Sequence, residues 1–170
     1  MNREYIVAPE PLTIASFAPY GQAILPAQPP APKRGDDWDC WFPVGTLSPG
    51  TQAAGIVTTR PTKAPITTME REPKTEFLLP ITGPLIQAVA IPGDLTDHFE
   101  QPDATTVKAF IIQPGQAIIM APGTWHWAAL PVGDEEVLYY FVGEAHDPEP
   151  GREASPWIPF VDDNMVRLSA

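Results

Sequence analysis

Cysteine, long apolar runs and basic residues are all scarce in this sequence of 170 residues. Its single cysteine, Cys40, excludes an internal disulfide and is compatible with a reducing compartment. We expect Cys40 to be a small buried apolar residue. No apolar run approaches the ~20 residues of a membrane-spanning helix, and the N-terminus lacks the apolar segment of a signal peptide. We therefore predict a cytoplasmic protein with no membrane partner.

Basic side chains are too few to offset the acidic ones. The 10 Lys and Arg residues stand against 21 Asp and Glu residues, which gives a formal net charge of −11 at pH 7. The resulting negative field repels polyanions, so nucleic acid is not an expected partner. A small anionic substrate is compatible with this charge only where basic side chains gather locally.

Proline and glycine, in contrast, are abundant, with 23 Pro and 12 Gly. Proline interrupts helix interiors and central strands, so this composition excludes a helical bundle and favours short strands joined by tight turns. A short helix is expected within residues 12–21, capped by Thr13 or Ser16. An opening strand is expected at residues 3–8, a loop at 26–36 and a half-buried strand at 37–43. Eight further short β-type runs are expected at 54–59, 66–71, 75–79, 86–91, 107–112, 117–120, 125–130 and 137–142.

These strands predict a mainly β fold, a barrel or two-sheet sandwich, in one domain over residues 1–170. Its core would span about residues 53–142, followed by an irregular tail over 144–170. Within that tail, residues 157–160 are expected to pack back on the barrel or on a second subunit.

Carboxylates and one histidine form the first candidate site. Glu70 and Glu72 are two residues apart, so on a strand they face the same side. Glu76 lies on the next strand, and His126 follows a Pro-Gly-Thr-Trp turn. Converging carboxylates require either protons or a cation, and an oxygen-rich set with one imidazole suits Mn, Fe(II), Ni or Zn. We predict Glu70, Glu72, Glu76 and His126 as metal ligands.

Other readings of the same residues remain open. Glu70 and Glu72 could lie on the solvent face of their strand, and His126 could be a buried histidine that bonds to a backbone carbonyl. One of Glu72 and His126 could also act as a catalytic base instead of a ligand. Without a metal, Glu76 with a raised pKa becomes the candidate acid.

Three basic residues are candidates for binding a substrate carboxylate. Lys74 lies in the turn between the two strands that contain the glutamates, and Arg60 follows the 54–59 strand. Lys108 is the one charged residue of the apolar 107–112 strand, where an inward lysine requires an anionic partner. The alternative is an outward Lys108 on the surface of the sheet. Arg71 alternates away from its glutamate neighbours, as a strand-surface charge would.

The order and spacing of several segments resemble the ureidoglycolate lyase family, also called ureidoglycolate hydrolase. The segments are 12–21, 69–73, 77–80, 107–111 and 123–126. The spacing from Glu70 to Gly83, and from Gly115 to His126, is similar to the two-part motif of cupins. The resemblance implies a cupin-type double-stranded β-helix (jelly-roll) barrel, usually a homodimer. It also implies metal-assisted cleavage of ureidoglycolate to glyoxylate and urea in purine (allantoin) catabolism.

Two departures from the family pattern concern the pocket. Family members typically have His where this chain has Glu72, and Gln where it has Glu76. They also have a Tyr-His-Arg stretch where this chain has Met-Ala-Pro at residues 120–122. We therefore expect the fold to be kept while the pocket is altered. The leading hypothesis is a lyase that cleaves a C–N or C–O bond in a small hydroxy-carboxylate, with Glu72 or His126 as base. The alternatives are a cupin isomerase or epimerase of a sugar or keto acid, and a non-catalytic small-molecule-binding cupin.

Overall fold

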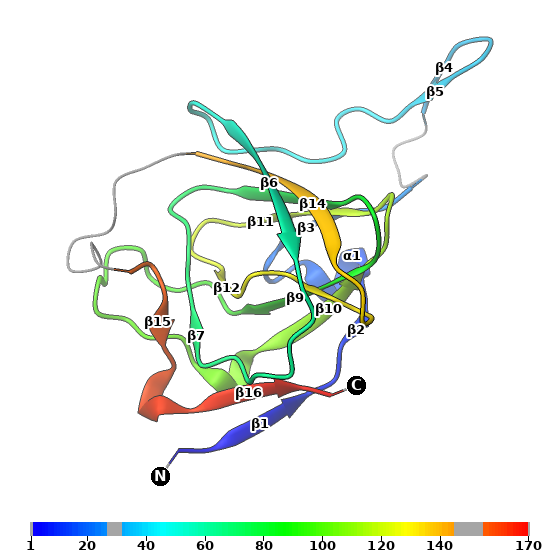
Figure 1. Ribbon diagram of the computed structural model, residues 1–170. Coiled ribbons are helices and arrows are strands. Elements are labelled where there is room, and N and C mark those ends of the chain that lie inside the picture. The colour runs from blue at the N-terminus through cyan, green and yellow to red at the C-terminus, as the bar shows by residue number, and fades with distance from the viewer. Residues whose placement is uncertain (1, 27–31, 145–154, 170) are drawn as a thin grey trace.

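Two five-stranded β-sheets form most of the computed structural model, which describes residues 2–26, 32–144 and 155–169 (Figure 1). The first sheet has the order β12 (Trp125–His126), β9 (Leu85–Ala90), β10 (Lys108–Ile112) and β2 (Glu10–Pro11), with β13 (Leu130–Pro131) also paired to β9. The second has the order β3 (Gly21–Ile24), β11 (Ala117–Met120), β8 (Glu76–Pro80), β14 (Val137–Gly143) and β6 (Ala53–Thr59).

The chain crosses repeatedly between the two sheets. It passes from β8 in the second sheet to β9 and β10 in the first, then to β11, back to β12 and β13, and finally to β14. Within both sheets every pair is antiparallel except that of β2 with β10. This alternation between facing sheets is the order of a jelly roll, and it confirms the mainly β prediction.

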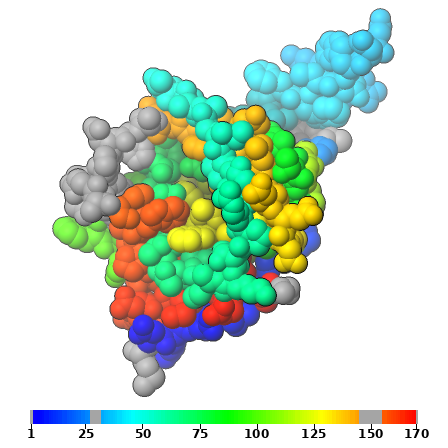
Figure 2. Space-filling view, viewed as in Figure 1, coloured from blue at the N-terminus to red at the C-terminus, as the bar shows by residue number. Residues whose placement is uncertain are grey.

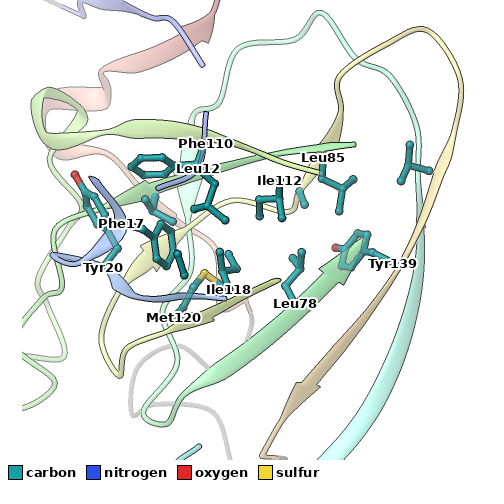
Figure 3. Packing of buried hydrophobic residues seen from close by; sticks show 14 residues of the cluster. Leu12, Phe17, Tyr20, Leu78, Leu85, Phe110, Ile112, Ile118, Met120 and Tyr139 are labelled. Carbon is teal, nitrogen blue, oxygen red and sulfur yellow. The ribbon is translucent and has the colours of Figure 1, made fainter. Parts of the chain in front are cut away.

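The main apolar core lies between the sheets. Phe17, Tyr20 and Phe110 form an aromatic group with ring centroids 5.3 to 5.9 Å apart. Figure 3 shows this group at one end of the core and Tyr139 at the other, with Leu78 and aliphatic side chains between them. Burial of a whole phenylalanine side chain stabilises a fold by roughly 1.5–3 kcal/mol. This core therefore holds the two sheets together.

The predicted helix is present but short. Helix α1 spans Ile14–Phe17, and Thr13 caps it by accepting a hydrogen bond from the Ser16 backbone N–H. The Ser16 hydroxyl accepts in turn from the Thr13 backbone N–H, which completes a capping box. Phe17 is fully buried, so the helix closes the aromatic end of the core. No helix among the described residues is long and apolar enough to cross a bilayer.

The predicted strands 54–59, 75–79, 86–91, 107–112, 117–120 and 137–142 match observed strands to within one or two residues at each end. The 125–130 run divides into β12 and β13. The 66–71 run keeps only β7 (Thr68–Met69), flanked by isolated bridges from Ile66 to Val166 and from Glu70 to His126. Its proline-rich surroundings interrupt a continuous ladder. The 3₁₀ turn η1 spans Ala104–Thr106, just before β10.

The described part of the tail is not irregular, which corrects that prediction. Strand β16 (Met165–Leu168) pairs in parallel with β1 (Glu4–Val7), and β15 (Ile158–Pro159) pairs with β7. The 3₁₀ turn η2 (Val161–Asp163) joins β15 to β16. Trp157 packs on Trp127 at 4.8 Å between ring centroids, and Phe160 is fully buried. Residues 157–160 therefore pack on the body of their own chain, which is the first of the two arrangements that we expected for them. Residues 145–154 of the predicted tail, and 27–31 of the predicted loop, lie outside the described residues.

A small hairpin projects from the body of the molecule (Figures 1 and 2). It consists of β4 (Lys33–Arg34) and β5 (Asp39–Cys40), all four residues of which are exposed. Cys40 is therefore exposed, and the predictions of a buried cysteine and a half-buried strand at 37–43 were wrong. The physical reason is that a two-pair hairpin away from the sheets has no core to pack against.

Candidate functional site

The backbone places Glu70 and His126 opposite each other. The Glu70 N–H donates to the His126 carbonyl at 3.0 Å, and the His126 N–H donates to the Glu70 carbonyl at 2.8 Å. Directly opposed residues of an antiparallel pair direct their side chains to the same face. The imidazole Nε2 consequently lies 3.7 Å from Glu70 Oε1.

A third side chain reaches the same point from the other sheet. Glu76 begins β8, and its Oε2 lies 4.0 Å from His126 Nε2. The exposed side-chain fractions are 5% for His126, 21% for Glu70 and 19% for Glu76. These three residues line a cavity of about 240 Å³ together with Val57, Leu78, Gln87, Trp127, Ala128, Ala129, Tyr139 and Phe141. The sheets therefore bring two carboxylates and one imidazole to one partly closed cavity.

Burial changes the acidity of this group. Desolvation raises the pKa of Glu70 to about 7; the nearby His126 lowers it, while the Glu72 and Glu76 charges raise it further. Desolvation likewise raises the pKa of Glu76 to about 7. Burial raises the pKa of Tyr139 to about 12, with added repulsion from Glu76 and Glu70. Near neutral pH the two carboxyl groups can therefore hold and release protons, while the Tyr139 hydroxyl stays protonated.

The tautomer of His126 follows from its other ring nitrogen. Nδ1 lies 3.0 Å from the Thr124 carbonyl oxygen, which can only accept a hydrogen bond. Nδ1 therefore carries the proton, and in the neutral ring Nε2 presents a lone pair to the cavity. The backbone carbonyl predicted as an alternative partner of His126 is thus present, and it orients the ring without occupying Nε2.

Glu72 borders a second cavity of about 360 Å³, which shares Glu76 and Phe141 with the first. Lys74, Thr75 and Glu144 line the same second cavity, with walls of Ala53, Ala54, Gly55 and Gly143. Of the four predicted ligands, the structure brings Glu70, Glu76 and His126 together and places Glu72 in this neighbouring cavity. The solvent-face alternative for Glu70 and Glu72 is not what is observed.

Two of the three predicted anion-binding residues lie elsewhere. Lys108 is the exposed first residue of β10, whereas Ala109, Phe110 and Ile112 after it are buried; the outward alternative for Lys108 is therefore the one observed. Arg60 follows the end of β6, pairs with Glu136 at 3.5 Å, and has a side chain that is 74% exposed. Neither residue lines either cavity, so their placement in the site was wrong. Lys74 lines the second cavity and remains the candidate.

The sequence of this chain is similar to that of known proteins. The profile of the family described as ureidoglycolate lyase matches residues 4–155. The chain belongs to the ureidoglycolate lyase family. The ureidoglycolate lyase of Chelativorans sp. (strain BNC1) is 27% identical over 135 residues, which covers 75% of this chain and 78% of that protein. Membership of this family, together with the jelly-roll order of the sheets, confirms the cupin-type fold predicted from the sequence.

Some solved structures show a more distant likeness. The oxalate decarboxylase of Bacillus subtilis matches with a TM-score of 0.40 and 18% identity, over 54% of this chain and 21% of that one. The TDP-quinovose 3,4-ketoisomerase WlaRB of Campylobacter jejuni matches with a TM-score of 0.42 and 9% identity, over 65% and 72%. RmlC of Streptococcus suis matches with a TM-score of 0.41 and 12% identity, over 68% and 60%. The chain thus spans about a fifth of the oxalate decarboxylase chain.

The site of this family member includes two residues that the sequence reasoning missed. Gln87 is 1% exposed, and its side-chain amide nitrogen donates to the carbonyls of Trp127 at 2.6 Å and Ala88 at 3.1 Å. Tyr139 is the inward member of a tyrosine pair on β14. A signal existed for both. Gln87 is the one polar residue of β9, and on a strand one of two adjacent tyrosines must face the core.

The donor set of the first cavity is suited to a divalent cation in its chemistry. Glu70 and Glu76 offer carboxylate oxygens, and His126 offers Nε2 while its Nδ1–H bonds to a carbonyl, which is the usual arrangement of a metal-binding histidine. Within the described residues, however, no three His, Cys, Asp or Glu side chains form a ready-made metal cluster. A metal at this point is therefore a proposal, not an observed centre.

Proposed function

We propose that this family member is a lyase that cleaves the C–N bond of a small hydroxy-carboxylate of the ureidoglycolate type. The observation that supports this most directly is the convergence of Glu70, Glu76 and His126 on one cavity. Cleavage of this kind needs a base for the hydroxyl proton and an acid for the departing nitrogen, both working near neutral pH. The cavity contains candidates for both roles.

In the proposed reaction His126 is the base. Its Nε2 lone pair takes the proton of the substrate hydroxyl, and the oxygen forms a carbonyl with the same carbon. The C–N bond breaks, and its electron pair moves to the nitrogen. The protonated carboxyl of Glu76 gives its proton to that nitrogen, because burial keeps this carboxyl partly protonated near pH 7. For ureidoglycolate the products are glyoxylate and urea.

Lys74 is the proposed partner of the substrate carboxylate. It lines the second cavity, which meets the first at Glu76. A substrate with its carboxylate at Lys74 would therefore have its reacting carbon near the wall shared by the two cavities. Glu70 would add a second carboxyl group to the wall of the first cavity and would exchange protons with His126 beside it.

A metal ion such as Ni, Mn, Fe or Zn would be held by Glu70, Glu76 and His126. In that alternative the Nε2 lone pair of His126 would be a metal ligand, and Glu72 would be the candidate base in its place. Such an ion would act as a Lewis acid on the hydroxyl and carboxylate of the substrate. Glu72 would contribute its charge from the second cavity and so favour a cation nearby.

The test of the proposed function is a direct assay of the purified chain with ureidoglycolate. The protein is treated with EDTA and assayed alone and after addition of Ni²⁺, Mn²⁺, Fe²⁺ or Zn²⁺. We expect glyoxylate and urea in equal amounts in at least one of these forms. Absence of both products in all of them would refute ureidoglycolate cleavage, and the bound metal content then shows whether the cavity holds an ion.

Replacement of Lys74 by Ala should raise KM about tenfold or more, with a smaller change in kcat. A hydrogen bond to a charged group is worth about 1.5–3 kcal/mol, and each 1.4 kcal/mol is a factor of ten in affinity. Steady-state kinetics of Lys74→Ala would be compared with those of Lys33→Ala, a change on the exposed hairpin. An unchanged KM in Lys74→Ala would show that the carboxylate binds elsewhere.

A further inference from the structure

Arg71 lies between Glu70 and Glu72 in the sequence, but its side chain points away from the cavity and is fully buried. It is therefore not the strand-surface charge that alternation predicted. Its Nη1 pairs with Glu100 Oε2 at 2.5 Å, and its Nη2 donates to the Asp97 carbonyl at 2.7 Å. The guanidinium carbon lies 4.7 Å from the centre of the Trp125 ring. One buried arginine thus contacts the residue that precedes His126.

The same arginine joins three segments that are far apart in the sequence. Glu100 Oε2 also accepts from the Asp94 N–H at 2.7 Å, which closes the 93–100 loop around the guanidinium. The Gly93 N–H donates to the Gly123 carbonyl at 2.9 Å, and the Gly123 N–H donates to the Glu72 carbonyl at 2.8 Å. The glutamate segment, the turn that leads to His126 and the 93–100 loop are therefore linked in one network.

Packing around Gly93 leaves this network little freedom to shift. A Cβ at Gly93 would lie under 3.0 Å from Glu100 Oε2, Arg71 Nη1 and Trp125 Nε1. Gly123, at φ +80°, adopts a backbone conformation that favours glycine, and a Cβ there would lie 2.9 Å from the Gly93 carbonyl. Neither position has room for a side chain, because neighbouring atoms lie too close to the backbone. The Trp125 ring is held between the Arg71 guanidinium and the backbone at Gly93.

A buried ion pair contributes little net stability compared with well-packed apolar residues, although breaking one by removing a partner is costly. The arginine fork offers geometry that a lysine does not, since it bonds to two oxygens and lies flat on an aromatic ring. Trp125 and His126 are adjacent on β12 and face opposite sides of it, so an indole fixed on Arg71 limits the movement of the backbone from which the imidazole projects. Glu70, whose carboxyl group lies beside the His126 ring in the first cavity, directly precedes Arg71 in the sequence.

We propose that Arg71 is a positioning residue. Through Trp125 and the backbone of the glutamate segment, it holds His126 Nε2 at its distances of 3.7 Å from Glu70 Oε1 and 4.0 Å from Glu76 Oε2. Its kinetic consequence rests on the proposed function, whereas its effect on the His126 ring does not. A misplacement of about 1 Å can lower a rate by about 10²-fold. We therefore expect Arg71→Lys to lower kcat about 10-fold and Arg71→Met about 10²-fold, with KM changed less than threefold or so.

Arg167, whose side chain is 44% exposed, provides a control with the same kinds of partner outside the site. It also pairs with a carboxylate, Glu4 at 2.8 Å, and donates to a backbone carbonyl, that of Lys63 at 2.9 Å. It lines neither cavity of the site. Arg167→Met should therefore lower thermal stability and leave kcat unchanged. If Arg71 were only a structural ion pair, its variants would show the same pattern, and the proposal would be overturned.

The His126 ring itself gives a readout that needs no activity. In protein labelled with ¹³C-histidine, the signal that His126→Asn removes identifies the His126 ring. We expect this signal to shift in Arg71→Lys, and also in Glu100→Gln, but not in Arg167→Met. Arg71→Lys and Glu100→Gln keep a polar group in place, so they test the proposal even if Arg71→Met does not fold.

The two readouts separate the two proposals. A His126 signal that stays at its wild-type position in Arg71→Lys and Glu100→Gln would overturn the positioning role. A shifted signal in a protein that cleaves no ureidoglycolate would support the positioning role and refute the proposed function. A shifted signal with a lowered kcat would support both.

Discussion

Replacement of His126 by Asn should lower kcat for C–N cleavage by about 10³-fold, because general base catalysis contributes typically 10²–10⁴-fold. The Asn side-chain amide can still donate to the Thr124 carbonyl, which now accepts from Nδ1 at 3.0 Å. It has no lone pair of comparable basicity at the position of Nε2, 3.7 Å from Glu70 Oε1. The variant therefore removes the base and keeps the hydrogen bond that orients it.

Rates of glyoxylate formation would be measured for the wild type and His126→Asn at several substrate concentrations. His98→Asn is the control, because His98 lines neither cavity, and its kinetics should match the wild type. Circular dichroism of both variants would show that the fold is intact. A His126→Asn protein with more than about a third of the wild-type kcat would exclude His126 as the base.

Replacement of Glu76 by Gln should stabilise the protein at pH 8 while it abolishes the proposed proton donation. The pKa of the Glu76 carboxyl is raised from 4.5 to about 7 by burial, so the charged form is disfavoured in the folded state. Between these two values the folded state binds more protons than the unfolded state. The free energy of unfolding therefore falls as the pH rises from about 4.5 through about 7.

The size of this effect follows from the shift. Each pKa unit corresponds to about 1.36 kcal/mol, so the rise from 4.5 to about 7 amounts to roughly 3 kcal/mol for this carboxyl once it is fully ionised. Gln has a similar shape and no charge. The difference in unfolding free energy between Glu76→Gln and the wild type should thus grow from low pH and reach about 3 kcal/mol near pH 8.

Urea unfolding in EDTA at pH 4.5, 6 and 8 would measure this difference without interference from a bound cation. Glu135→Gln, on an exposed residue of the loop before β14, should show no comparable pH dependence. A Glu76→Gln difference that is the same at all three pH values would contradict the raised pKa. A gain in stability with a loss of turnover would be the trade-off expected of a carboxyl kept buried for its chemistry.

The glutamate spacing shows how far local pattern can reach. Glu70 and Glu72 were expected to face the same side of one strand, but Glu70 is in an isolated bridge with His126 and Glu72 lies outside any strand. Glu70 borders the cavity of His126, and Glu72 borders the adjoining cavity. That division depends on where β8, in the other sheet, places Glu76 in the wall shared by the two cavities. A two-residue period specifies a side, and it does not specify which cavity lies on that side.

The directions of charged side chains were the least predictable feature. The sequence left Lys108 either inward or outward, and alternation predicted Arg71 as a surface charge. Lys108 is exposed, as in the second of its two readings, whereas Arg71 is buried, which corrects that prediction. For Arg71 the deciding partners are Glu100, Asp97 and Trp125. A charge can be buried only where partners from other segments compensate its lost hydration, and those partners are not neighbours in the sequence.

The sequence alone determined the mainly β class, the capped helix at Thr13, most of the strands and the family. It also grouped Glu70, Glu76 and His126, together with Glu72, as one candidate site. These depend on local propensity, turn residues and spacing, which act over a few residues. The folded chain was needed to separate Glu72 from His126, to remove Lys108 and Arg60 from the site, to add Gln87 and Tyr139, and to place β16 beside β1. Each of these results depends on contacts between residues far apart in the chain, because burial and shared cavities arise only when the sheets face each other.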